Sequence, residues 1–269
     1  MVQSENILEI SSLTKTFGGL VAIFDLDCTV SRGIIKAIIG PNGAGKTTLV
    51  NCINKVYPFE NGEISFDGTD ITRLPSHKVA ALGIARTFQN IALFKGMTVL
   101  DNLMLGAHAR IKKGVLSGGI YWGLAQKREI EFRKKIEKII DFLEMAHVRK
   151  ALVGPLAYGI QKRVEFGRAL ALDPKLIILD ECMAGMNLEE KEDMARFILD
   201  ANEELDKTIV LIEHDMGLVM DISDRILVLE YGGKIAEGTP DEVRKNPEVI
   251  RAYLGAAAND MGPSAKAEA

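Results

Sequence analysis

The sequence has few cysteines, no long apolar runs and no excess of basic residues, and each shortage excludes a class of protein. Its three cysteines, Cys28, Cys52 and Cys182, are scattered without the spacing of a metal site. We interpret them as buried, reduced thiols, which are typical of the cytoplasm. The 33 lysines and arginines and 37 aspartates and glutamates give a formal net charge of −4. This charge argues against a general nucleic-acid binder, so we expect no nucleic-acid partner.

No apolar run approaches the ~20 residues that a membrane-spanning helix needs. The first residues, 1–6, contain neither the basic nor the apolar segment of a secretory signal peptide. If the protein works at a membrane, we expect it to do so as a peripheral subunit. Hydrophobic residues make up 47% of the chain, which is enough for a sizeable core.

Short apolar runs alternate with helical patterns, which predicts an α/β fold with a largely parallel sheet. In the middle of the chain, residues 90–167 lack strand alternation, and apolar spacing predicts a helix over 126–143. Its basic face is either solvated or in contact with anionic lipid headgroups or a membrane partner. We expect a surface loop over 114–123 and a flexible tail over 256–269. The expected strands lie at 7–10, 20–23, 34–39, 62–68, 176–179, 208–212 and 225–229.

A phosphate-binding loop is the strongest single signal. The sequence Gly40-Pro41-Asn42-Gly43-Ala44-Gly45-Lys46-Thr47-Thr48 fits G-x-x-x-x-G-K-[ST] and lies between a predicted strand and a predicted helix. Glycines let successive N–H groups point at one anion, and the helix N-terminus adds roughly half a positive charge. Lys46 can reach the β- and γ-phosphates of a nucleotide, and the Thr47 hydroxyl can ligate Mg²⁺.

Further polar residues follow predicted strands. Asp180, at the tip of the strand 176–179, is placed to hold Mg²⁺, and Glu181 is placed to polarise an attacking water. His214 follows the strand 208–212, at the sheet edge where ligands of α/β proteins gather, and we interpret it as a γ-phosphate contact. Gln89 lies where the α/β segment passes into the helical one, and its amide can sense Mg²⁺ and the attacking water.

A second candidate anion site lies at the start of a predicted helix. Residues 156–163 read Leu-Ala-Tyr-Gly-Ile-Gln-Lys-Arg, with Gly159 near the helix N-terminus.

Together these segments resemble the nucleotide-binding subunit of an ATP-binding cassette (ABC) transporter over about residues 5–255. Residues 40–48 resemble Walker A, Gln89 the Q-loop, 156–161 the signature, 176–181 Walker B, 184–187 the D-loop, and His214 the switch histidine. The resemblance implies a P-loop NTPase core of ABC ATPase type with an inserted helical subdomain. It implies one domain over 1–255, with the catalytic core in 1–89 and 168–255 and the helical subdomain in 90–167.

The same resemblance implies ATP and Mg²⁺ as cofactors. Thr47, Gln89 and Asp180 would hold Mg²⁺, and Glu181, His214 and Gln89 would act in hydrolysis. Phe17 would stack on adenine, residues 40–48 would bind the phosphates, and Ala157 and Gly159 would face the ATP of a second subunit. ATP would be sandwiched in a head-to-tail dimer whose closure drives the membrane subunits.

A finer resemblance is to the branched-chain (hydrophobic) amino acid importers, on residues 83–89, 97–103, 110–133, 184–187 and 249–255. It implies a second, homologous but different ATPase, two permease subunits and, indirectly, a periplasmic binding protein. The chain would then lie at the cytoplasmic face of the inner membrane. Urea or amide importers and a lipopolysaccharide-export ATPase remain alternatives. A soluble ABC ATPase acting on DNA or ribosomes, or a subunit that holds ATP without hydrolysing it, fits less well.

The signature departs from the family pattern Leu-Ser-x-Gly-Gln. Ala157 stands in place of serine and Ile160 in place of glutamine, while Gly159 is kept. Cys182 also replaces the proline that usually follows the Walker B glutamate. We therefore expect the site that uses this chain's signature to be weaker than the site that uses its Walker A.

Overall fold

The computed structural model describes residues 5–87, 92–108 and 121–260. The chain divides into two compact units, Met1–Ala80 with Lys207–Ala269 and, between them, Ala81–Asp206. The expected boundaries at 89/90 and 167/168 stay a prediction. No helix in the described part of the chain is long and apolar enough to cross a membrane.

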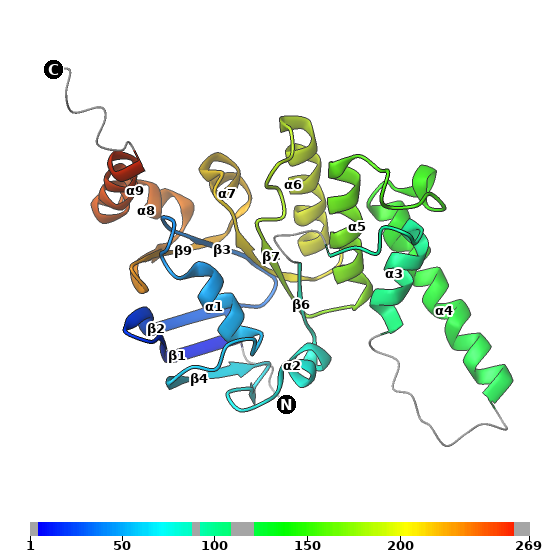
Figure 1. Ribbon diagram of the computed structural model, residues 1–269, viewed down its shortest axis with the longest axis horizontal. Coiled ribbons are helices and arrows are strands. Elements are labelled where there is room, and N and C mark those ends of the chain that lie inside the picture. Colours follow the sequence, from blue (N-terminus) through cyan, green and yellow to red (C-terminus); the bar gives the residue numbers. More distant parts are fainter. Residues whose placement is uncertain (1–4, 88–91, 109–120, 261–269) are drawn as a thin grey trace. The chain divides into compact units, whose positions relative to one another are not determined.

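The first unit contains two sheets (Figure 1). One is antiparallel in the order β2-β1-β4-β5, and the other places β10, β9, β3 and β8 side by side. Strands β3 and β8 are buried at every residue, which is typical of parallel strands covered on both faces. The strands are β1 (Asn6–Phe17), β2 (Leu20–Ser31), β3 (Ile35–Ile39), β4 (Asn61–Phe66), β5 (Thr69–Asp70), β8 (Thr208–Ile212), β9 (Arg225–Glu230) and β10 (Gly233–Gly238).

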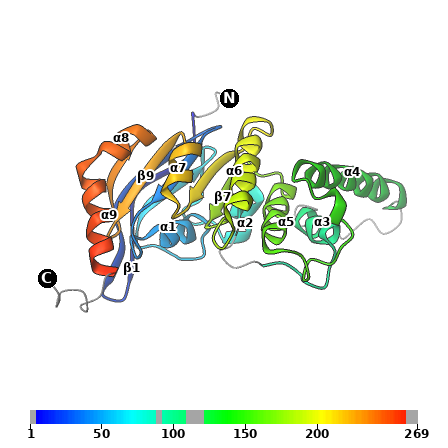
Figure 2. The same cartoon turned by 90° about the horizontal axis from the view of Figure 1, so that it is seen from above.

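The helices of the first unit flank these sheets. In Figure 2, α8 and α9 lie beside each other, in agreement with their contacts, and both contact β10. The helices are α1 (Lys46–Ile53), α7 (Met216–Ile222), α8 (Pro240–Lys245) and α9 (Pro247–Asp260), and α2 (Ser76–Leu82) runs across the boundary of the units.

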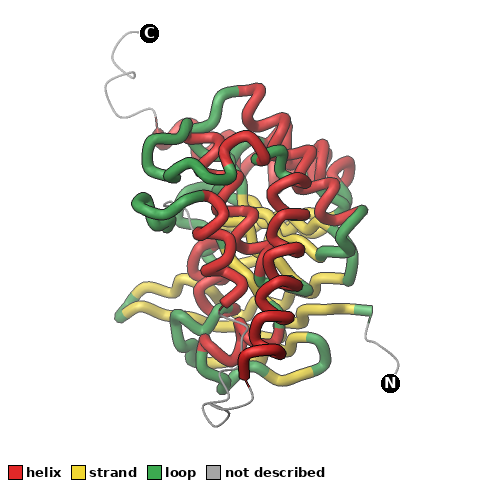
Figure 3. Tube along the Cα trace, turned by 90° about the vertical axis from the view of Figure 1, so that its right-hand side faces the viewer, coloured by secondary structure: helices red, strands yellow, loops and turns green. Residues whose placement is uncertain are grey.

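The second unit is mostly helical. Its two strands, β6 (Ile84–Arg86) and β7 (Leu176–Asp180), pair in parallel. Helices α3, α4 and α5 pack against one another, and Figure 3 draws the helices in red. The helices are α3 (Val99–His108), α4 (Tyr121–Phe142), the 3-10 turn η1 (Ala146–Val148), α5 (Tyr158–Ala171) and α6 (Leu188–Glu203).

One sequence-based boundary was wrong. Helix α4 begins at Tyr121, so Tyr121 and Trp122 belong to a helix and not to the loop expected over 114–123. Residues 114–120 of that expected loop lie outside the described residues. The flexible tail over 256–269 stays a prediction; helix α9 continues to Asp260, and residues 256–258 are alanines, which favour a helix.

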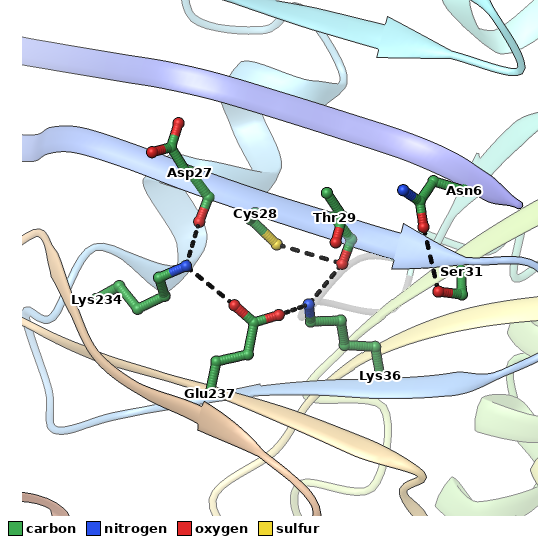
Figure 4. Close-up of polar contacts among 8 residues, drawn as sticks. All are labelled: Asn6, Asp27, Cys28, Thr29, Ser31, Lys36, Lys234 and Glu237. Atoms are coloured by element: carbon green, nitrogen blue, oxygen red, sulfur yellow. Dashed lines mark hydrogen bonds and ion pairs between the residues drawn. The ribbon is translucent and has the colours of Figure 1, made fainter. Parts of the chain in front are cut away.

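A buried charge cluster joins the two sheets of the first unit (Figure 4). The Lys36 ammonium on β3, 2% exposed, donates to the Thr29 carbonyl on β2 and to the Glu237 carboxylate on β10. Lys234 Nζ donates to the second Glu237 oxygen at 3.0 Å and to the Asp27 carbonyl at 3.0 Å. Burial alone would raise the pKa of Glu237, but the hydrogen bonds and charges of Lys36 and Lys234 outweigh it and lower this pKa. The strand that leads into the phosphate loop is thus held on one face by ion pairs.

Candidate nucleotide-binding site

The phosphate loop follows β3 and needs glycine at two positions. Gly40 has φ +151, and a Cβ there would lie 2.1 Å from the Leu229 carbonyl oxygen of β9. Gly45 has φ +102, and its Cβ would lie 2.6 Å from the Ala22 carbonyl oxygen of β2. Any larger residue would clash with backbone, so the loop can curl this tightly only with glycine. Gly43, with φ +79, faces open space.

The start of α1 is arranged to receive an anion. Gly45 is its N-cap, and a glycine has no side chain that could cap the N–H groups of the first turn. Lys46 is 6% exposed, and its Nζ donates to the Gly40 and Pro41 carbonyls at 2.6 and 3.0 Å. Thr47 is exposed.

These residues fit the phosphates of a nucleotide. The left-handed glycines turn the loop, the uncapped helix directs its dipole at the loop, and Lys46 adds a full charge. Of the other loop residues, Asn42 is exposed and Thr48 is half-buried. Ala44 is buried, and its N–H donates to the Pro41 carbonyl at 3.1 Å.

Phe17 lies at the end of β1 with 43% of its surface exposed. The Tyr57 ring meets it edge to face, with centroids 5.2 Å apart, and Lys15 Nζ lies 4.9 Å from its centroid. Lys15 is itself held by Glu60 at 2.9 Å, and Glu60 also accepts the Thr16 N–H at 2.7 Å. The Phe17 ring is thus held by Tyr57 and Lys15 and remains partly exposed, which suits stacking on a base.

His214 lies at the same sheet edge as the phosphate loop. Strands β3 and β8 are parallel, with Ala37 opposite Leu211, so their carboxyl ends coincide. Gly40 follows β3, and His214 follows β8 by two residues and is exposed. The structure therefore brings His214 and the phosphate loop onto neighbouring strand ends within the first unit.

Asp180 ends β7 in the second unit. Its side chain is 3% exposed, and its Oδ2 accepts a hydrogen bond of 2.6 Å from Arg86 Nη2. Its N–H donates to Thr87 Oγ1 at 3.3 Å. Arg86 and Thr87 were not recognised from the sequence as parts of the site, because their partners lie more than 90 residues away in the chain.

Glu181 follows Asp180 directly and has φ +51, a left-handed conformation that is uncommon for a residue with a side chain. Its carbonyl accepts the Ala184 N–H at 3.3 Å, which closes a turn. Cys182, in this turn, is 3% exposed and packs into the core. Such backbone outliers concentrate at functional sites.

The signature segment starts α5. Ala157 is the N-cap of this helix and provides no side-chain hydrogen bond. The serine that the family has at this position would supply a hydroxyl to cap the helix, and alanine cannot. Gly159 is buried, and a Cβ there would lie 2.4 Å from Glu190 Oε1. Glu190 forms a capping box with Asn187, the last residue of the D-loop. The signature glycine therefore packs on the side chain that caps the next helix.

The remaining site residue, Gln89, lies outside the described residues. Phe17, the phosphate loop and His214 belong to the first unit. Asp180, Glu181, Ala157 and Gly159 belong to the second.

Comparisons with known proteins agree with this geometry. A family model described as "ABC transporter" matches residues 23–184, and one described as "Branched-chain amino acid ATP-binding cassette transporter" matches residues 234–259. The chain is 41% identical over 254 residues to a high-affinity branched-chain amino acid transport ATP-binding protein, BraF, of Pseudomonas aeruginosa. That alignment covers 94% of this chain and 100% of BraF.

A second relative is LivG of Escherichia coli, also a high-affinity branched-chain amino acid transport ATP-binding protein, at 37% identity over 94% of this chain and 100% of LivG. Among solved structures, the ADP conformation of MJ1267, an ATP-binding cassette of an ABC transporter, matches with a TM-score of 0.81 and 32% identity. That match covers 93% of this chain and 99% of MJ1267. The fold of an ABC cassette is thereby confirmed, and the chain is an ATPase that belongs to the ATP-binding proteins of ABC transporters.

Proposed function

We propose that this chain hydrolyses ATP to energise a membrane importer of branched-chain or other hydrophobic amino acids. The observation that carries the proposal is the phosphate loop, whose two backbone-crowded glycines lead into the N-terminus of α1, in a chain that matches BraF over the whole length of BraF. The names of BraF and LivG support the class of substrate.

Within this function we assign roles to the site residues. Residues 40–48 bind the phosphates, and Phe17 stacks on adenine. Glu181 polarises the attacking water, and His214 and Gln89 contact the γ-phosphate and the water. Thr47, Asp180 and Gln89 hold Mg²⁺, which neutralises phosphate charge when it is bound.

We further propose that ATP is sandwiched in a head-to-tail dimer with a homologous but different ATPase, at the cytoplasmic face of the inner membrane. Two permease subunits and, indirectly, a periplasmic binding protein complete the assembly. Support comes from Ala157, because an exposed N-cap without a hydroxyl gives a weaker γ-phosphate contact than the family's serine. A homodimer would carry Ala157 at both composite sites and so weaken both, whereas a partner with serine at this position would leave one site at full strength, which favours a partner of different sequence.

The test is transport by the assembled complex in proteoliposomes. Binding protein loaded with leucine, isoleucine or valine should stimulate ATP hydrolysis and uptake, and Glu181→Gln in this chain should remove most of that hydrolysis. Glu189→Gln, an exposed carboxylate in the first turn of α6, is the matched control and should leave it unchanged. Stimulation by urea or short amides but not by these amino acids would contradict the proposed substrate.

A further inference from the structure

Arg86 and Asp180 form a buried ion pair at the end of two parallel strands. Their side chains are 10% and 3% exposed, and Nη2 and Oδ2 are 2.6 Å apart. A carboxylate this deeply buried is costly unless a cation or hydrogen bonds compensate it. Among the described residues, Arg86 is the cation that the structure pairs with Asp180.

The backbone holds Arg86 in place independently of the ion pair. Arg86 lies opposite Ile178 in the parallel register of β6 and β7. The next residue, Thr87, donates its N–H to the Ile178 carbonyl at 3.0 Å and accepts the Asp180 N–H at 3.3 Å. All these contacts lie within the second unit. The backbone therefore fixes the position from which the guanidinium reaches the carboxylate.

We propose that Arg86 is a positioning residue that serves as a built-in cation for Asp180 between nucleotide-binding events and thereby weakens the binding of Mg²⁺ by itself. This inference rests on the proposed function, which assigns Mg²⁺ to Asp180. A second positive group close to the same carboxylate is repelled by the guanidinium, and in a buried site this repulsion is poorly screened. Mg²⁺ then binds well only together with the phosphates of ATP, which supply further negative charge.

The test uses the full-length chain with Arg86→Met, which keeps most of the side-chain length and removes the charge. In titrations of Mg²⁺ against a fluorescent ATP analogue, half-saturation should occur at about tenfold lower Mg²⁺ than in the wild type. Without nucleotide, the variant should melt at a lower temperature, and Mg²⁺ alone should raise that temperature in the variant but not in the wild type.

Three controls separate charge from packing. Arg86→Lys keeps the charge and should retain a Mg²⁺ requirement close to that of the wild type. Arg32→Met breaks the Arg32–Asp67 ion pair of the first unit and should lower the melting temperature without changing the Mg²⁺ requirement. Adding Asp180→Asn to Arg86→Met should recover part of the lost thermal stability, because no buried carboxylate is then left uncompensated. If Arg86→Met does not fold, Arg86→Gln provides the same comparison.

The outcomes distinguish this inference from the proposed function. If Asp180→Asn weakens Mg²⁺-dependent nucleotide binding but Arg86→Met and Arg86→Gln titrate like the wild type, the role of Arg86 is wrong and the proposed function stands. If Asp180→Asn leaves the Mg²⁺ requirement unchanged, the assignment of Mg²⁺ to Asp180 is itself wrong.

Discussion

Lys36, in the strand that leads into the phosphate loop, is neutralised by Glu237, which lies 201 residues later in the chain. Glu237 accepts from Lys36 with one oxygen and from Lys234 with the other, so a single carboxylate compensates two ammonium groups (Figure 4).

Glu237→Gln should lower the free energy of unfolding by about 3 kcal/mol, because it leaves the Lys36 ammonium buried without a counter-charge. Urea denaturation of the purified chain measures this loss. Glu248→Gln, an exposed carboxylate in the first turn of α9, should change stability by less than about 0.5 kcal/mol. Equal effects of the two substitutions would show that the cluster contributes no more than a surface charge.

The same cluster should make stability depend on pH. The pKa of Glu237 is lowered in the folded state, so its contribution is present above the ordinary glutamate pKa of 4.5 and is lost as the pH falls through the lower, folded value. Stability measured between pH 3 and 7 should therefore decrease on the acid side, and Glu237→Gln should reduce that slope. A slope that Glu237→Gln does not change would assign the acid sensitivity to other carboxylates.

Restoring the missing hydroxyl at the signature should have two separate effects. Ala157→Ser supplies an N-cap to α5 and should raise stability by about 1 kcal/mol. In the complex, the hydroxyl should also strengthen the γ-phosphate contact at the partner's ATP, by about 10- to 150-fold in affinity or rate at that site. Ala157→Asp is the matched variant, because it caps the helix equally well but repels phosphate. If Ser and Asp alter turnover alike, the effect is one of helix stability alone.

Gly159→Ala should destabilise the second unit through Glu190. The new Cβ would meet Glu190 Oε1, and moving that side chain breaks the capping box with Asn187, so we expect a loss of about 1–3 kcal/mol. Adding Glu190→Ala removes the clash, so the double variant should be no less stable than Glu190→Ala alone. Adding Glu189→Ala instead should give additive losses, since Glu189 is exposed. Additivity in both pairs would contradict the packing described here.

The sequence predicted the buried parallel strands best. Strands β3, β7, β8 and β9 lie within one residue of their expected ends, because a run of apolar residues is a local signal. Strands β1 and β2 extend far beyond the apolar cores expected at 7–10 and 20–23, since register shifts and polar residues interrupt their alternation. Strand β6, with three residues, is too short to show a period.

The candidate site also has parts that the sequence predicts and parts that it does not. The phosphate loop is a contiguous motif, and its strand–loop–helix context could be predicted. The residues that contact the other parts of the site could not be predicted. Tyr57 packs on Phe17, Arg86 pairs with Asp180, and Glu190 packs on Gly159, and these partners are separated by 31 to 94 positions of the chain. Such partners are determined by packing, and a single sequence contains no local pattern for them.

The pairing of β3 has a consequence for synthesis on the ribosome. Its hydrogen-bonded neighbours, β8 and β9, follow it by roughly 170 residues or more, and the carbonyl that crowds Gly40 belongs to Leu229 of β9. At ordinary elongation rates of about 5–20 residues per second, the phosphate loop emerges about 10–40 s before the strands that shape it. The nascent chain must therefore pass most of its translation with this loop unformed, and nucleotide can stabilise the first unit only once β8 and β9, in the last quarter of the chain, have been made.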